Sequence, residues 1–173
     1  SSLEGISASA ANLVSLNLQT CESLENIEPV GDLTHLEEIY LADCSSLKSI
    51  EALGKVKSLT KLTLERCRAL SSLKGIQDLS LQISRSYGGA VLSLSGCSSL
   101  ATLEHFPKNP ANFDTLDLSY MKSLKSLDYL PPLSTVKSLR GYGSGFEDIS
   151  SLHNLPNLES AGFSNCSDLK NVE

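Results

Sequence analysis

The sequence contains no tryptophan, one methionine and few aromatic residues, which make up 5% of its 173 positions. A hydrophobic core must therefore be built almost entirely from leucine and other aliphatic side chains. No apolar run approaches the roughly 18 residues that a membrane-spanning helix needs, so we expect no membrane segment in this chain. The formal net charge of −6 argues against a nucleic-acid-binding protein, because phosphate recognition requires clusters of lysine and arginine.

Catalytic and metal-binding motifs are also missing from the sequence. There is no Gly-rich phosphate loop, no His-Glu-x-x-His motif and no serine elbow. The three histidines are scattered, and successive cysteines are at least 23 residues apart, which is unlike the paired ligands of a zinc site. We therefore predict that this chain is not an enzyme and has neither a cofactor nor a metal site.

What the sequence does contain is one repeated pattern, Leu-x-x-Leu-x-Leu-x-x-Cys-x-x-Leu-x-x-Ile/Leu. Cys21, Cys44 and Cys67 occupy the same place in it, called the ladder position here, and follow one another at intervals of 23 residues. A fixed period in this range with this leucine spacing indicates a stacked solenoid. The ladder residues of repeats 1 to 7 are Cys21, Cys44, Cys67, Cys97, Met121, Ser144 and Cys166.

The pattern predicts a coarse structure. Each Leu-x-Leu pair alternates apolar and polar residues and predicts a short strand with one buried face. The return segments, such as 28–32 and 131–134, are short and contain proline, which predicts 3₁₀ turns or one-turn helices. The predicted fold is an α/β solenoid: a curved array of about seven rungs with one parallel concave β-sheet and short 3₁₀ or irregular convex segments. We expect one domain over residues 1–173, lacking terminal caps and belonging to a longer protein.

These motifs resemble those of leucine-rich repeat proteins, and the resemblance covers essentially the whole chain. The repeat length and the return segments resemble the short internalin-like and SDS22-like classes, and the ladder cysteines are similar to those of trypanosome leucine-rich repeat proteins. Plant immune receptors share Leu-x-x-Cys-x-x-Leu, but they usually follow it with Leu-Pro, where this chain has Ser49, Ile50 and Glu51. The resemblance implies a module that binds other proteins.

The cysteines are interpreted as buried structural thiols, since free cysteine is among the most buried residue types. Parallel side chains on neighbouring rungs lie about 4.8 Å apart, farther than the roughly 3.8 Å between the Cβ atoms of a disulfide. A catalytic thiol needs exposure and a nearby base, which the pattern does not supply. Five unpaired thiols favour a reducing, intracellular compartment. A location on the extracellular surface is the alternative.

A protein partner is expected on the concave face, where residues flanking the strand leucines point outward. Two clusters on that face combine tyrosine and arginine, the residues most enriched at binding hot spots, with other charged residues. The first cluster comprises Glu38, Tyr40, Asp43, Lys61, Glu65 and Arg66. The second comprises Asp117, Tyr120, Arg140 and Tyr142.

Two irregular segments are alternative candidates for a functional surface. Ser84–Gly89 lies in a seven-residue expansion before repeat 4, and Gly141–Gly145 replaces apolar anchors in repeat 6, which is expected to loosen the stack. The primary hypothesis is a protein–protein interaction module that binds a partner through the concave face. The alternatives are a structural spacer or assembly array that stacks end to end within a larger protein, and an extracellular adhesion domain.

Overall fold

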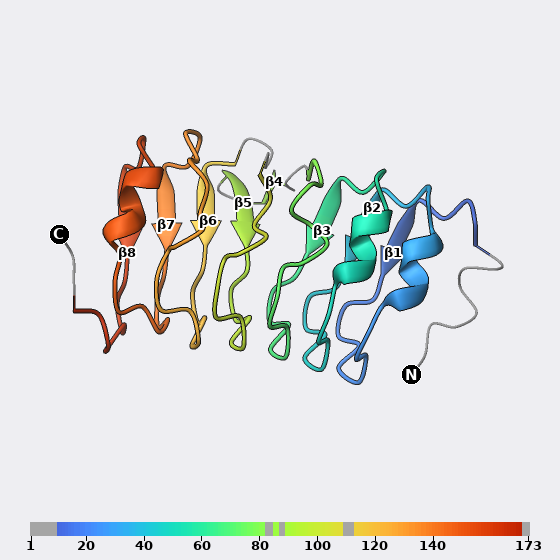
Figure 1. Cartoon of the computed structure of the whole chain (residues 1–173), viewed down its shortest axis with the longest axis horizontal. Coiled ribbons are helices and arrows are strands. Elements are labelled where there is room, and N and C mark those ends of the chain that lie inside the picture. The colour runs from blue at the N-terminus through green and yellow to red at the C-terminus, as the bar shows by residue number, and fades with distance from the viewer. Residues whose placement is uncertain (1–9, 82–84, 87–88, 109–112, 171–173) are drawn as a thin grey trace.

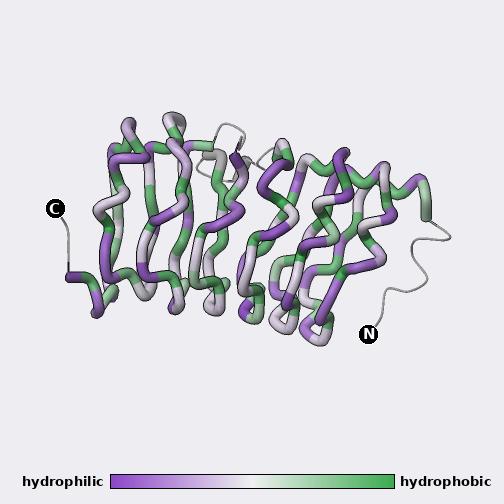
Figure 2. The backbone as a smooth tube through the Cα atoms, viewed as in Figure 1, coloured by the Kyte–Doolittle hydropathy of each residue, from purple (hydrophilic) through white to green (hydrophobic). Residues whose placement is uncertain are grey.

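The computed structural model describes residues 10–81, 85–86, 89–108 and 113–170. The chain winds as successive coils, and the strands of neighbouring coils lie side by side along the long axis (Figure 1). Hydrophobic and hydrophilic residues alternate along the coils (Figure 2). Among the described residues, no helix is long and apolar enough to cross a membrane.

Each repeat contributes one short strand to a parallel sheet. The first sheet contains β1 (Ser15–Asn17), β2 (Glu38–Tyr40) and β3 (Lys61–Thr63) in that order. The second sheet contains β4 (Arg85–Ser86), β5 (Gly89–Ser93), β6 (Thr115–Asp117), β7 (Ser138–Arg140) and β8 (Ser160–Gly162). Only β4 within these two sheets is antiparallel to its neighbour.

The strand register is the register of the sequence repeat. Leu16 pairs with Ile39, and Ile39 pairs with Leu62, in the first sheet. In the second sheet, Leu92 pairs with Leu116 and Leu116 with Leu139. The same apolar position of each repeat therefore stacks on that of the next, and the predicted solenoid is confirmed.

Three return segments form 3₁₀ helices, as predicted for residues 28–32: η1 (Glu28–Asp32), η2 (Glu51–Lys55) and η3 (Ser150–Asn154). They lie on the side of the coils opposite the strands (Figure 1). The prediction of helical turns at 131–134 was wrong, because this segment is an irregular stretch and then a turn. Pro131 and Pro132 are adjacent and neither has an N–H group to donate, which removes two of the donors that a helical turn needs.

The expectation of one continuous sheet was also wrong. Within the described residues no strand pairing joins β3 to β5. The seven-residue expansion places two additional residues, Gly89 and Ala90, at the start of β5, and these pair with β4. At the break, the side chains of Leu62 in β3 and Leu92 in β5 are only half-buried. The equivalent residues Ile39 and Leu116 are 0% exposed.

The glycine-rich segment of repeat 6 does not leave a gap in the core. Gly141 stands where repeats 1 to 5 have leucine and repeat 7 has Phe163. A side chain at Gly141 would begin 2.8 Å from the rings of Phe146 and Phe163. Those rings are 5.7 Å apart in an edge-to-face arrangement, and Phe146 is fully buried. Aromatic side chains thus fill the missing leucine volume, which overturns the expectation that this segment loosens the stack.

Candidate partner-binding surface

The residue immediately before each ladder residue has a left-handed backbone conformation. We call these residues the turn row; their φ angles lie between 58° and 78°. The turn row consists of Thr20, Asp43, Arg66, Gly96, Tyr120, Gly143 and Asn165. The N–H groups of the first six donate to a carbonyl of the next repeat at 2.8–2.9 Å. One turn-row residue per repeat is therefore placed in register beside the strands.

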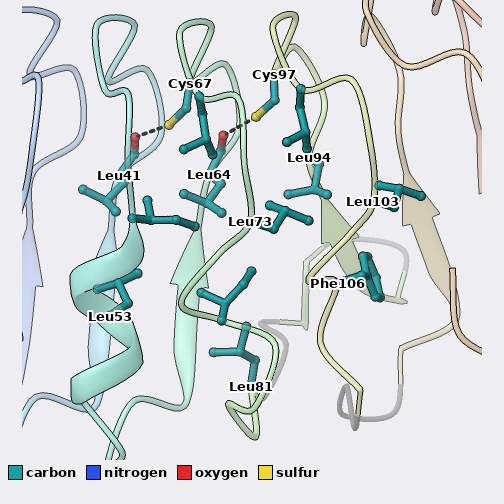
Figure 3. Close-up of a cluster of buried hydrophobic side chains, with 14 of the residues drawn as sticks. Leu41, Leu53, Leu64, Cys67, Leu73, Leu81, Leu94, Cys97, Leu103 and Phe106 are labelled. Atoms are coloured by element: carbon teal, nitrogen blue, oxygen red, sulfur yellow. Dashed lines mark hydrogen bonds between the residues drawn. The ribbon is translucent and has the colours of Figure 1, made fainter. Parts of the chain in front are cut away.

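The ladder side chains connect each repeat to the preceding one. The thiols of Cys44, Cys67 and Cys97 donate hydrogen bonds to the carbonyls of Leu18, Leu41 and Leu64, at 3.1, 3.2 and 3.0 Å. Two of these bonds are drawn in Figure 3. The prediction of buried structural thiols did not include this directional contact between repeats.

The two substituted ladder positions, Met121 and Ser144, behave differently from each other. The Ser144 hydroxyl donates to the carbonyl of Leu118 at 2.6 Å and accepts the N–H of Met121 at 3.1 Å. Met121 has no side-chain donor, and its side chain is fully buried. Serine thus keeps the inter-repeat hydrogen bond, whereas methionine fills the volume alone.

The buried thiols have weak acidity. Burial raises the pKa of Cys67 and of Cys97 to about 12, from an ordinary value of 9.0. All five cysteines are free thiols, of which Cys21 and Cys166 are partly exposed. At neutral pH Cys67 and Cys97 are therefore protonated, which allows each to donate its hydrogen bond.

The first predicted cluster is brought together on repeats 2 and 3. The Tyr40 hydroxyl donates to Glu38 Oε2 at 2.9 Å, and Lys61 Nζ lies 3.7 Å from Glu38 Oε1. The same ammonium lies 5.0 Å from the centre of the Tyr40 ring, within the range of a cation–π contact. The hydrogen bond from Tyr40 and the charge of Lys61 hold the pKa of Glu38 below its ordinary value.

Arg66 and Asp43 form a separate pair within this cluster. The guanidinium donates from Nε to Asp43 Oδ1 at 2.5 Å and from Nη2 to Oδ2 at 2.6 Å. This hydrogen-bonded pairing lowers the pKa of the Asp43 carboxyl and raises that of Arg66. Glu65 is half-buried beside Arg66, and its charge also raises the pKa of Arg66.

The second predicted cluster spans repeats 5 and 6. Tyr120 and Tyr142 are 59% and 40% exposed, and the Tyr120 N–H donates to the Tyr142 carbonyl at 2.8 Å. Each ring lies against a glycine of the next repeat: a side chain at Gly143 would begin 3.2 Å from the Tyr120 ring, and one at Gly162 would overlap the Tyr142 ring. The glycines therefore leave room for two exposed aromatic side chains.

The charged members of the second cluster do not form an ion pair. Strand pairing places Asp117 opposite Arg140, but among the described residues no salt bridge joins them. The Asp117 carboxylate instead accepts the N–H of Ser119 at 2.9 Å, and Arg140 is exposed. The Arg140 guanidinium is therefore available on the surface.

The repeats of this chain are similar to those of known proteins. Residues 6–87 match the BspA type leucine-rich repeat region, in six copies. The chain contains leucine-rich repeats. A crystal structure of an internalin C2 from Listeria monocytogenes strain 4b F2365 is similar, with 16% sequence identity and a TM-score of 0.33 over 84% of this chain. The chain spans 54% of that internalin chain. No curated protein matches the sequence.

Stacked leucine-rich repeats form an interaction scaffold whose extended surface is presented to protein partners. Two surface features of this leucine-rich repeat protein were missed by sequence reasoning. Tyr129 is 70% exposed on a return segment and has a left-handed conformation with φ of 66°. Gly96 leaves an opening in the turn row between Arg66 and Tyr120. The alternating pattern does not reach either position, because both lie outside the strands.

The structure describes only part of the seven-residue expansion before repeat 4. Ser84, Tyr87 and Gly88 of the expansion lie outside the described residues, while Arg85–Ser86 forms β4. Within the described part of the chain, no group of three or more histidine, cysteine or acidic side chains is arranged to hold a metal ion.

Proposed function

We propose that this leucine-rich repeat protein binds a protein partner through the outward-facing residues of its strands and the adjoining turn row, which we call the sheet face. The observation that carries the proposal is that neighbouring repeats present two exposed rings, Tyr120 and Tyr142, each packed against a glycine of the next repeat. Exposed tyrosine near an exposed arginine, here Arg140, which forms no ion pair among the described residues, has the composition of a binding hot spot.

Preorganisation of the sheet face supports the same proposal. Glu38, Tyr40 and Lys61 restrain one another through a hydrogen bond, an ion pair and a ring contact. Asp43 holds Arg66 by two hydrogen bonds. Side chains that are already ordered lose less conformational entropy when a partner binds. The ion pairs themselves are exposed and contribute little to stability, so their restraint matters mainly for binding.

The experiment compares two variants of the chain. The sheet-face variant replaces Tyr40, Arg66, Tyr120 and Arg140 with alanine. The control variant replaces Tyr129 and Lys55 with alanine on the return side. Circular dichroism and thermal unfolding establish that both variants fold. A partner captured by the wild-type chain and identified by mass spectrometry is then purified and titrated against each.

The proposal expects the purified partner to bind the control variant as it binds the wild type, and to lose at least about tenfold in affinity for the sheet-face variant. Equal binding to both variants would contradict it. Concentration-dependent self-association of the wild-type chain in light scattering, with no loss in the sheet-face variant, would favour the assembly array instead.

A reducing, intracellular location accompanies this proposal. Five free thiols in one small chain fit a compartment in which disulfides are rare. The test is mass spectrometry of the chain isolated without a reducing agent. Five unmodified thiols would support the location, and cysteines paired in disulfides would point to an extracellular role.

A further inference from the structure

A recess interrupts the turn row at repeat 4. It encloses about 300 Å³ between Arg66 and Tyr120. The lining residues are Arg66, Arg68, Ser95, Gly96, Ser98 and Tyr120. They come from three successive repeats, so the stacking of the solenoid builds the recess.

The recess exists because repeat 4 has glycine in the turn row. Gly96 has φ of +78°, and a Cβ atom there would lie 2.9 Å from Cγ of Arg66. On the far side, the Tyr120 ring packs against Gly143 of the next repeat instead of covering Gly96. The absence of one side chain therefore leaves a space between two large ones.

Hydrogen-bond donors line the recess, and no carboxylate does. Within the described residues, Arg68 forms no salt bridge, although its charge helps to lower the pKa of the Asp43 carboxyl. The hydroxyls of Ser95, Ser98 and Tyr120 make no hydrogen bond there. Arg66 uses two N–H groups on Asp43, and a guanidinium has five, so three remain. Glu65 is next to Arg66 in the chain but is not among the lining residues.

This composition matches one class of ligand. A planar or tetrahedral oxyanion accepts several hydrogen bonds at once, and arginine is the side chain that recognises it with two parallel donors. The chain carries a net charge of −6, so overall electrostatic attraction does not draw an anion to it. Recognition of an anion must instead come from a local set of donors.

We propose that the recess binds an anionic side chain, a carboxylate or a phosphate, on an acidic segment of the protein partner. This inference rests on the proposed function and names the chemistry of the partner at one point of the sheet face. Arg68 supplies one guanidinium, which forms no salt bridge among the described residues, and Arg66, oriented by Asp43, supplies the second. The serine and tyrosine hydroxyls donate to the remaining oxygen lone pairs.

The test is an NMR titration of the isotope-labelled chain with three acetylated, amidated peptides. They are hexaglutamate, hexaglutamine, and a glycine pentapeptide with phosphoserine at its centre. We expect saturable shifts of the amide signals of residues 66–68 and 95–98 with hexaglutamate or the phosphoserine peptide, and none with hexaglutamine. The tighter of the two anionic peptides identifies the anion as carboxylate or phosphate.

Variants separate the recess from general charge attraction. Arg68→Gln is expected to weaken the anionic peptide at least tenfold, since hydrogen bonds to charged groups are worth about 1.5–3 kcal/mol. Lys55→Gln removes the same charge from η2, away from the recess, and should leave the affinity unchanged. Gly96→Asn keeps every charge and tolerates the left-handed conformation, but its Cβ atom would displace the Arg66 side chain and its amide would take up space in the recess, so it should also weaken binding.

Equal weakening by Arg68→Gln and Lys55→Gln, or binding of hexaglutamine as tightly as hexaglutamate, would overturn the inference. The titration contains no partner protein, so its failure is distinct from failure of the proposed function. Peptide binding could be absent while the sheet-face variant still loses its partner. In that case only the anion-binding recess would be rejected.

Discussion

Repeats 2 and 3 are held together differently from repeats 3 and 4. At the first junction β2 and β3 pair in parallel and the core residue Ile39 is fully buried. At the second, β3 and β5 do not pair within the described residues. A small apolar cavity of about 20 Å³, lined by residues such as Leu62, Leu92 and Phe106, lies there.

The turn row and the ladder nevertheless continue across the second junction. The Arg66 N–H donates to the Ser95 carbonyl at 2.8 Å, and the Cys97 thiol donates to the Leu64 carbonyl at 3.0 Å. Residues around the ladder cysteines are drawn together in Figure 3. The turns therefore hold successive repeats in register even where strand pairing fails.

The largest effects should come from the strand leucine positions of the two junctions. Ile39→Ala deletes a fully buried side chain and should lower the free energy of unfolding by about 2–5 kcal/mol. Leu62→Ala deletes a half-buried side chain beside an existing cavity and should cost less, about 1–2 kcal/mol. Urea unfolding followed by circular dichroism measures both. Equal losses would mean that the two junctions pack alike, against the comparison.

Ladder variants at the two junctions should lower the free energy of unfolding by similar amounts. Cys67→Ala and Cys97→Ala each delete one thiol that donates to the preceding repeat, at 3.2 and 3.0 Å. Each should lose about 1 kcal/mol of unfolding free energy, while Cys→Ser variants, which keep a donor as Ser144 does, should lose less. A much smaller loss for Cys97→Ala would show that the ladder does not hold repeats 3 and 4 together.

Thiol reactivity tests whether the broken junction opens. Cys67 and Cys97 flank it, and burial raises the pKa of each to about 12. At pH 8 both should react with iodoacetamide at least tenfold more slowly than the partly exposed Cys21 and Cys166, because the thiolate is the nucleophile. Peptide mass spectrometry at timed intervals gives the four rates. Fast labelling of Cys97 alone would indicate local opening at the break.

The same pKa shifts predict an alkaline limit to stability. The folded thiols keep their protons above the ordinary pKa of 9.0, up to about 12, whereas the unfolded chain releases them first. The stabilising contribution is therefore complete below pH 9 and is lost as the pH rises from about 9 towards 12. Urea midpoints measured across this range should fall for the wild type. They should fall less steeply for the Cys67→Ser, Cys97→Ser double variant.

The smallest effects should come from exposed ion pairs at the two junction types. Lys48 pairs with Glu25 at 2.6 Å between regular repeats, and Lys108 pairs with Asp78 at 3.0 Å across the break. Lys48→Gln and Lys108→Gln should each change the unfolding free energy by less than about 0.5 kcal/mol, since exposed pairs contribute little. A loss above 1 kcal/mol for Lys108→Gln alone would show that surface charge compensates for the missing strand pairing.

Much of the fold was predictable because the 23-residue spacing of Cys21, Cys44 and Cys67 fixes the register of the leucines between them. The same spacing identifies the flanking residues, such as Tyr40 and Lys61, that share an outward face and make contact in the structure. The break at β3 was not predictable, because an expansion of seven residues could equally have looped out without separating the strands.

The turn row and the recess were also beyond the sequence alone. Arginine and tyrosine rarely adopt a left-handed conformation. The residue types of Arg66 and Tyr120 therefore do not predict the turn conformation that they share with Gly96. The direction of the ladder thiols depends on the carbonyl of the preceding repeat, which is a three-dimensional neighbour and not a sequence feature. A period of 23 residues specifies which side chains stack, but not which atoms they meet.

The most direct test of partner binding by the sheet face is an NMR titration of the labelled chain with its purified partner. The account predicts that signal changes concentrate in residues 38–43, 61–66 and 138–142, and that η1, η2 and η3 change little. Changes concentrated in the three 3₁₀ helices, with β2, β3 and β7 unaffected, would place the partner on the return side and contradict it.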